Sequence, residues 1–121
     1  MRFLKANEVI ELNKLTTTKH GGLHSIRELS LLESAIANPQ NLYHYQNSDI
    51  FTLASSYAMS IIKNHPFLDG NKRTGFITMD LFLRLNGKII KFPHKATVEI
   101  MVKVATNEVN LANFSEWLRS L

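Results

Sequence analysis

The sequence predicts an all-α fold, a single compact domain of about six helices that spans residues 1–121. Apolar residues recur at the three- and four-residue spacing of helices almost throughout the chain. No pair of alternating apolar and polar runs surrounds an Asn-Gly or Asp-Gly turn, the pattern that indicates a β-hairpin. A chain of 121 residues can bury one hydrophobic core but not two, so a second domain is not expected.

The first half of the chain is predicted to hold two helices, each followed by a loop. Asn7 can cap a first helix over residues 8–17, because its side chain can accept a hydrogen bond from an N–H group of the first turn. A glycine-containing loop follows, and a second helix is predicted over residues 26–37. Asn38-Pro39 should end this helix, since the residue before a proline disfavours the helical region. Residues 40–47 are then expected to form a polar loop.

The second half of the chain is predicted to hold four helices. Ser48 can cap the first of them and Pro66 should end it. The next helix is apolar nearly all round, which is typical of a helix in the centre of a fold. The last one carries an inward face that includes Trp117 and Leu118. These helices are expected over residues 49–64, 71–86, 96–106 and 111–119.

The composition excludes some classes of protein and leaves others open. Without cysteine the chain forms neither disulfides nor thiolate metal sites, and a cytoplasmic location is expected. No apolar stretch approaches the roughly 20 residues of a membrane-spanning helix, and no signal peptide is evident. The net charge of +4 suits a nucleotide or an acidic protein as a partner. The basic residues are scattered, however, so direct nucleic-acid binding is not expected.

Chemistry-bearing residues concentrate in one run between the two central predicted helices, His65-Pro66-Phe67-Leu68-Asp69-Gly70-Asn71-Lys72-Arg73-Thr74. Histidine readily accepts a proton near neutral pH, so His65 is the candidate catalytic base. Asp69 offers an oxygen ligand to Mg²⁺, which usually takes one or two protein carboxylates and completes its shell with water and phosphate. The run therefore predicts a base beside a metal-bound phosphate.

The residues that follow Asp69 are suited to binding phosphate. Gly70 lets the backbone turn, and the N–H groups of residues 70–72 then lie at a helix start, where free N–H groups and the helix dipole favour an anion. The Asn71 side chain can add an amide donor, and Lys72 and Arg73 supply positive charge. Because cations oppose the dipole at a helix N-terminus, their position favours phosphate binding over a merely solvated helix start.

Simpler interpretations of these residues stay open. An Asp-Gly pair is often only a turn, and the run lacks the spacing of a Walker P-loop. His65 and Asp69 could serve a metal hydrolase, but two adjacent ligands fall short of the three that are usual for catalytic zinc. We expect the histidines elsewhere in the chain to be structural: His20, His24, His44 and His94.

The whole run resembles the signature motif of the Fic/Doc family, on the side of its Doc (death-on-curing) toxins. Further segments similar to that family are Ile26-Arg27-Glu28, Leu31–Ala35, Asn38-Pro39-Gln40, Phe82–Gly87 and Trp117-Leu118, so the resemblance covers most of the chain. It implies a Fic/Doc-like all-α fold with the active-site loop between two central helices. By motif position it implies a base at His65, a magnesium ligand at Asp69, and phosphate binders at Asn71, Lys72 and Arg73.

The Doc side of the family implies a toxin that transfers the terminal phosphate of ATP to a hydroxyl of elongation factor Tu and so inhibits translation. Fic proteins, which transfer AMP instead, carry glycine after the asparagine and a second arginine three residues after the first. This chain has Lys72 and Phe76 at those positions. Because Phe76 cannot bind phosphate, phosphate transfer is favoured, and AMP transfer to a protein hydroxyl is the alternative.

The resemblance also implies a protein partner. Self-inhibited Fic proteins carry Ser or Thr, three residues, Glu, and then Gly or Asn, and no such string occurs in this chain. Doc proteins are restrained by a separate antitoxin whose tail folds against the toxin as a helix, so an antitoxin partner is expected here. A non-catalytic module of the same fold, which binds nucleic acid or protein, is the remaining alternative.

Overall fold

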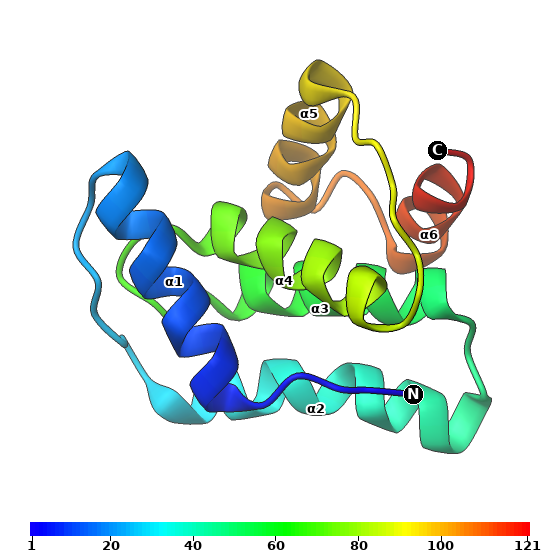
Figure 1. Cartoon of the computed structure of the whole chain (residues 1–121), viewed down its shortest axis with the longest axis horizontal. Helices are drawn as coiled ribbons and strands as arrows, with labels where there is room; N and C mark the ends of the chain where they lie inside the picture. The colour runs from blue at the N-terminus through cyan, green and yellow to red at the C-terminus, as the bar shows by residue number, and fades with distance from the viewer.

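The computed structural model describes residues 1–121 and confirms the all-α class. Six helices follow one another: α1 (Ala6–His20), α2 (Leu29–Gln46), α3 (Ile50–Asn64), α4 (Asn71–Leu85), α5 (His94–Ala105) and α6 (Leu111–Arg119) (Figure 1). The β-type pairing consists of one isolated antiparallel bridge, between Ile26 and Phe67. None of the helices combines the length and the apolar character that crossing a bilayer demands.

Helix α3 lies at the centre of the fold. It packs against α2 on one side and α4 on another, while α5 and α6 cover its remaining surface (Figure 1). Its side chains are mostly buried, and the Tyr57 ring packs against Phe82 of α4 with the ring centroids 5.0 Å apart. In α4 only Lys72, Arg73 and Arg84 are exposed, which confirms the prediction of a central helix from its nearly all-round apolar pattern.

A glycine allows α3 and α4 to approach closely. A Cβ atom added to Gly75 of α4 would lie 3.0 Å from the carbonyl oxygen of Ala58 and 3.1 Å from Cγ1 of Ile62, both on α3. No larger side chain fits this gap without moving one helix, because the first of these atoms belongs to the backbone. Gly75 therefore fixes the separation of the two helices that flank the predicted active-site loop.

The start of α1 differs from the prediction. The helix begins at Ala6 with Lys5 as its N-cap residue, so Asn7 lies inside the helix and the prediction that it caps was wrong. The Glu8 carboxylate accepts a hydrogen bond from the Lys5 N–H at 2.9 Å. A glutamate at the third helical position commonly satisfies this donor, and here it allows the helix to start earlier.

Helix α2 runs through Pro39, although Asn38-Pro39 was expected to end it and residues 40–47 were expected to form a loop. Leu42 and Tyr43, which follow the proline, are partly buried against the core. Asn38 itself donates to the Ser60 hydroxyl of α3 at 2.9 Å. This packing of the second half of the helix outweighs the local cost of an internal proline, which removes one backbone hydrogen bond.

The cap of α3 is Asp49 rather than Ser48. Its carboxylate accepts from the Thr52 N–H at 2.9 Å and from Arg119 of α6 at 2.7 Å. Burial raises the pKa of Asp49, but the hydrogen bonds from Thr52 and Arg119 outweigh it and hold the pKa below its ordinary value. One carboxylate thus caps the central helix and ties the end of α6 to it.

We expect Gly75→Ala to destabilise the protein by about 1–3 kcal/mol, because the new methyl group would push α4 away from α3. Helix propensity alone would predict that this substitution stabilises the protein, since alanine in a solvent-exposed helix is more favourable than glycine by about 1 kcal/mol. Urea unfolding of the two proteins measures the difference. A variant as stable as the parent would show that the gap between α3 and α4 can accommodate the methyl group.

Tyr57 provides a test of the buried core by pH. The residue is fully buried, and its hydroxyl oxygen accepts a hydrogen bond from the Leu4 N–H at 2.9 Å. Burial, assisted by the negative charge of Glu8 and opposed by the hydrogen bond from Leu4, raises the pKa of Tyr57 to about 12. In the unfolded chain the phenol ionises near its ordinary value of 10.0.

The free energy of unfolding is therefore expected to fall between pH 10 and 12, where the unfolded chain has lost the phenol proton and the folded protein still holds it. The loss is about 1.4 kcal/mol per pH unit from this group. In Tyr57→Phe this component should vanish, at a cost of about 1 kcal/mol at neutral pH for the unpaired Leu4 N–H. Denaturant unfolding of both proteins at a series of pH values measures the difference, and a constant difference across this range would contradict the assignment.

Candidate active site

The run from His65 to Gly70 forms the connection between α3 and α4, as predicted. His65 is the C-cap residue of α3, with φ 52° and ψ 55° in the left-handed region, and its N–H donates to the Ile61 carbonyl at 3.1 Å. The side chain is exposed and makes no hydrogen bond within the chain. The imidazole at this bend is therefore accessible from solvent.

The side chain of Asn71 holds the loop through two hydrogen bonds to the backbone of Phe67. Its Oδ1 accepts from the Phe67 N–H at 3.1 Å, and its Nδ2 donates to the Phe67 carbonyl at 2.9 Å. The Phe67 side chain is fully buried in the core, so the amide and the ring together hold the middle of the loop. An amide nitrogen carries two hydrogens, so the bond to the Phe67 carbonyl uses one of the two on Nδ2.

The start of α4 presents a row of unpaired donors. The N–H groups of residues 70–73 donate no hydrogen bond within the chain, and the first bond of the helix runs from the Thr74 N–H to the Gly70 carbonyl at 2.8 Å. No side chain caps this helix. Lys72 and Arg73 extend from the same turn and are exposed. Free N–H groups, the positive end of a helix dipole and two cations together form an anion-binding arrangement.

Asp69 is held at both its carboxylate and its backbone. Its Oδ2 accepts from the Leu23 N–H at 2.9 Å, and its carbonyl accepts from the Asn13 side chain at 2.9 Å. Its Oδ1 has no hydrogen-bond partner in the chain. The chain has no cluster of three or more His, Asp or Glu side chains that could hold a metal ion alone. A lone carboxylate next to the free N–H groups of a helix start is compatible with Mg²⁺, which usually takes one or two protein carboxylates and draws its other ligands from phosphate and water.

Asn13 is a site residue that the sequence reasoning missed. It is fully buried on α1, and its Nδ2 donates both to Asp69 and to the Thr74 hydroxyl, the latter at 3.0 Å. Its Oδ1 pairs with Nδ1 of His24 at 2.7 Å. The signal was present in the sequence, because Asn13 lies one turn after Val9 on the inward face of an amphipathic helix, where a polar side chain needs partners.

Residues 23–28, which precede α2, lie alongside the loop. The Leu68 N–H donates to the Ser25 carbonyl at 2.9 Å, and the Arg27 N–H donates to the Pro66 carbonyl at 2.7 Å. Contacts from this segment therefore reach the loop at Pro66, Leu68 and Asp69. Sequence reasoning assigned no site role to it, since pairing between segments so far apart in the chain leaves no local pattern.

Phe76 lies one turn into α4, and aromatic packing fills the space around it. Its ring meets that of Phe92 edge to face, with centroids 4.9 Å apart, and Phe92 in turn lies 6.4 Å from Trp117 of α6. The position at which Fic proteins carry a second arginine is thus part of an apolar cluster that joins three segments of the chain.

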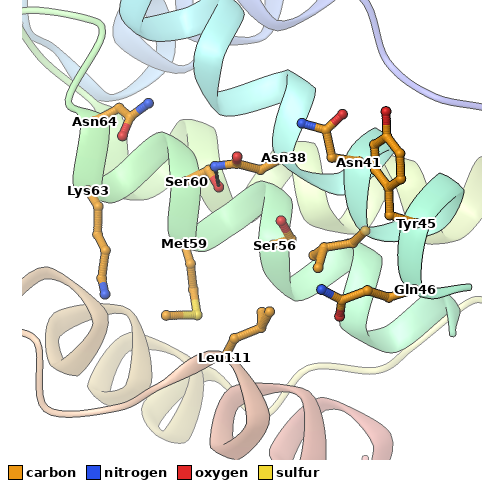
Figure 2. Close-up of a pocket in the computed structure, with 11 residues that line it drawn as sticks. Asn38, Asn41, Tyr45, Gln46, Ser56, Met59, Ser60, Lys63, Asn64 and Leu111 are labelled. Atoms are coloured by element: carbon orange, nitrogen blue, oxygen red, sulfur yellow. Dashed lines mark hydrogen bonds between the residues drawn. The ribbon is translucent and has the colours of Figure 1, made fainter. Parts of the chain in front are cut away.

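A hollow of about 440 Å³ lies elsewhere, between α2 and α3. Asn38 and Asn41 of α2, Met59 of α3 and Leu111 of α6 are among the residues that surround it (Figure 2). None of its lining residues belongs to the run 65–74, although Asn64 at its edge directly precedes His65. Within the run, the side chains of His65, Asp69, Lys72 and Arg73 are exposed.

Comparisons with known proteins point to one family. The model of the Fic/DOC family matches residues 3–83, which include the entire loop. The chain is 30% identical over 122 aligned residues to the protein kinase doc of Escherichia phage P1, covering 100% of this chain and 96% of that protein. It is also 30% identical over 95 residues to the toxin Doc of Mycolicibacterium smegmatis, covering 75% of this chain and 73% of that one.

Gly70→Ala is expected to disturb the site through both strain and crowding. Gly70 has φ 77°, and an added Cβ would lie 3.3 Å from the side chains of Asn13, Thr16 and Thr17. We expect a loss of stability of about 1–3 kcal/mol. The matched control is Gly87→Ala, with φ 87° but no atom within 4 Å of its new Cβ. Thermal unfolding should show a larger loss for Gly70→Ala, and equal losses would mean that the contact with α1 has no effect.

Proposed function

Because the chain belongs to the Fic/DOC family, we propose that it is a toxin that transfers the terminal phosphate of ATP to a protein hydroxyl. The observation that carries this proposal is the start of α4, where the unpaired N–H groups of residues 70–73 and two exposed cations follow an exposed histidine. Phosphoryl transfer requires mainly the positioning of phosphates and the neutralisation of their charge, and this arrangement suits both needs.

Each residue of the loop has a distinct role in this proposal. The N–H groups of residues 70–73 and the side chains of Lys72 and Arg73 bind phosphate oxygens of ATP. The free hydrogen on Nδ2 of Asn71 adds one donor while the rest of its amide holds the loop. Asp69 would hold Mg²⁺ through a carboxylate oxygen, and the bound ion would neutralise charge on the phosphates.

His65 acts as the general base. It accepts the proton of the substrate hydroxyl as the hydroxyl oxygen forms a bond to the terminal phosphorus of ATP. The bond between that phosphorus and the bridging oxygen breaks, so the products are the phosphorylated protein, ADP and a proton on His65. Lys72 and Arg73 remain bound to phosphate throughout and stabilise the negative charge on its oxygens.

Phe76 supports phosphate transfer over AMP transfer. The second arginine that the Fic pattern places there would have to enter the cluster of Phe92 and Trp117, where a cation would lose much of its hydration. The name of the phage P1 relative, a protein kinase, agrees with phosphate transfer for the family member that matches this chain over its full length.

The substrate and the partner are the finer parts of the proposal. We propose elongation factor Tu as the protein substrate, the cytoplasm as the place of action, and an antitoxin with a helical tail as the restraining partner. The likeness to Doc toxins is what supports all three. The exposed position of His65 agrees with a protein as substrate, because a folded partner can reach the loop without opening the core.

The proposal predicts which phosphate of ATP is transferred. With purified elongation factor Tu and Mg²⁺, label from γ-labelled ATP should appear on the protein and label from α-labelled ATP should not. His65→Ala should lower the rate by about 10²–10⁴-fold, because the base is lost. His94→Ala is the matched control, since His94 is also exposed and also lies at a helix end.

Gel analysis of the labelled proteins measures both quantities. Label from the α position alone would overturn the kinase assignment in favour of AMP transfer. If the purified factor takes up no label, the same assay in a bacterial lysate tests whether another protein is the substrate. Transfer that His65→Ala leaves unchanged would remove His65 from the role of base.

A further inference from the structure

Arg27 makes an unusual set of contacts for an exposed cation. Its Nε donates to the His65 carbonyl at 2.8 Å, and its Nη2 donates to the Asn64 carbonyl at 3.0 Å. Its own N–H donates to the Pro66 carbonyl at 2.7 Å. No carboxylate lies within salt-bridge distance of its guanidinium group. The side chain is thus engaged with the backbone that carries the proposed base.

We propose that Arg27 is a positioning residue for His65. It holds the backbone of His65 in the left-handed conformation and thereby sets the direction in which the imidazole leaves the chain. This inference rests on the proposed function for its catalytic consequence, but the structural part concerns only the conformation of His65.

The backbone of His65 needs such support. A residue other than glycine at φ 52° adopts a conformation that L-amino acids disfavour, and it persists only where neighbouring groups hold it. The last carbonyls of a helix lack partners within the helix and carry its negative dipole end. The planar fork of a guanidinium group satisfies two of these carbonyls at once, and its charge is favourable there.

No other group in the chain orients the imidazole of His65 through a hydrogen bond. It makes no hydrogen bond within the chain, whereas a catalytic base is commonly oriented by a third group. Its direction therefore depends on its backbone and its own rotamer. Arg27 is in turn fixed to the loop, because the neighbouring Ile26 forms the antiparallel bridge with Phe67. A substitution at Arg27 should accordingly alter the conformation of His65 more than the packing of the core.

The test compares Arg27→Gln and Arg27→Lys with Arg84→Gln. Arg84 is the matched control, an exposed arginine of α4 that pairs with Asp80 and not with the loop. In Arg27→Gln we expect kcat of phosphate transfer to fall about 10- to 100-fold, the size of effect that a displaced catalytic group produces, with KM for ATP unchanged. Arg27→Lys should recover part of this loss, since an ammonium group can bind one carbonyl but lacks the fork.

A second measurement does not depend on activity. The imidazole signals of His65, identified by their absence in His65→Ala, are followed by NMR in each protein. Arg27→Gln should shift or broaden them, because the ring samples more than one direction, and Arg84→Gln should leave them unchanged. The His65 signals can change in Arg27→Gln even if neither the parent protein nor any variant transfers phosphate. In that case the proposed function fails and the positioning role stands.

Three results would overturn the positioning role. The first is an unchanged His65 signal in Arg27→Gln. The second is a raised KM for the protein substrate with kcat unchanged, which would indicate that Arg27 contacts that substrate directly. The third is a fall in the melting temperature of Arg27→Gln that accounts for its whole loss of activity and is not seen in Arg84→Gln. Arg27 would then be a structural residue only.

Discussion

The close approach of α3 and α4 is the constraint on which the site depends. With only hydrogen at Gly75 between α4 and the backbone of α3, the two helices lie side by side. The end of one and the start of the other are then spanned by residues 65–70 alone. A short connection between two packed helices has few conformations, so His65 at its beginning and the free N–H groups at its end keep a defined spatial relation.

The loop itself is shaped from outside the two helices that it joins. Asn13 of α1 donates to the Asp69 carbonyl, and the segment around Arg27 is hydrogen-bonded to the backbone from Asn64 to Leu68. From the two helices themselves, Asn71 of α4 contributes its paired bonds to Phe67. These contacts are hydrogen bonds, some between backbone groups and some from amide or guanidinium side chains to the backbone, and hydrogen bonds define direction more sharply than apolar packing does.

The start of α4 lacks features that usually stabilise a helix N-terminus. A capping side chain would satisfy one of the free N–H groups, and α3 and α6 have such caps at Asp49 and Asn110. In α4 the corresponding position is Gly70, which has no side chain, and the two cations that follow oppose the helix dipole. A bound phosphate would remove both penalties, so the features that weaken the free helix are those that favour an anion.

The sequence by itself determined the all-α class, the central place of α4 and the run that carries the candidate site, because periodicity and residue chemistry are local properties. It misjudged Asn7 and Pro39, where local propensity was overridden by Glu8 and by the packing of Leu42 and Tyr43. Only the tertiary structure decided that Asn13 and Arg27 belong to the site. Their partners lie 56 and 38 residues away along the chain, and hydrogen bonds across such separations depend on how the helices pack rather than on any nearby pattern.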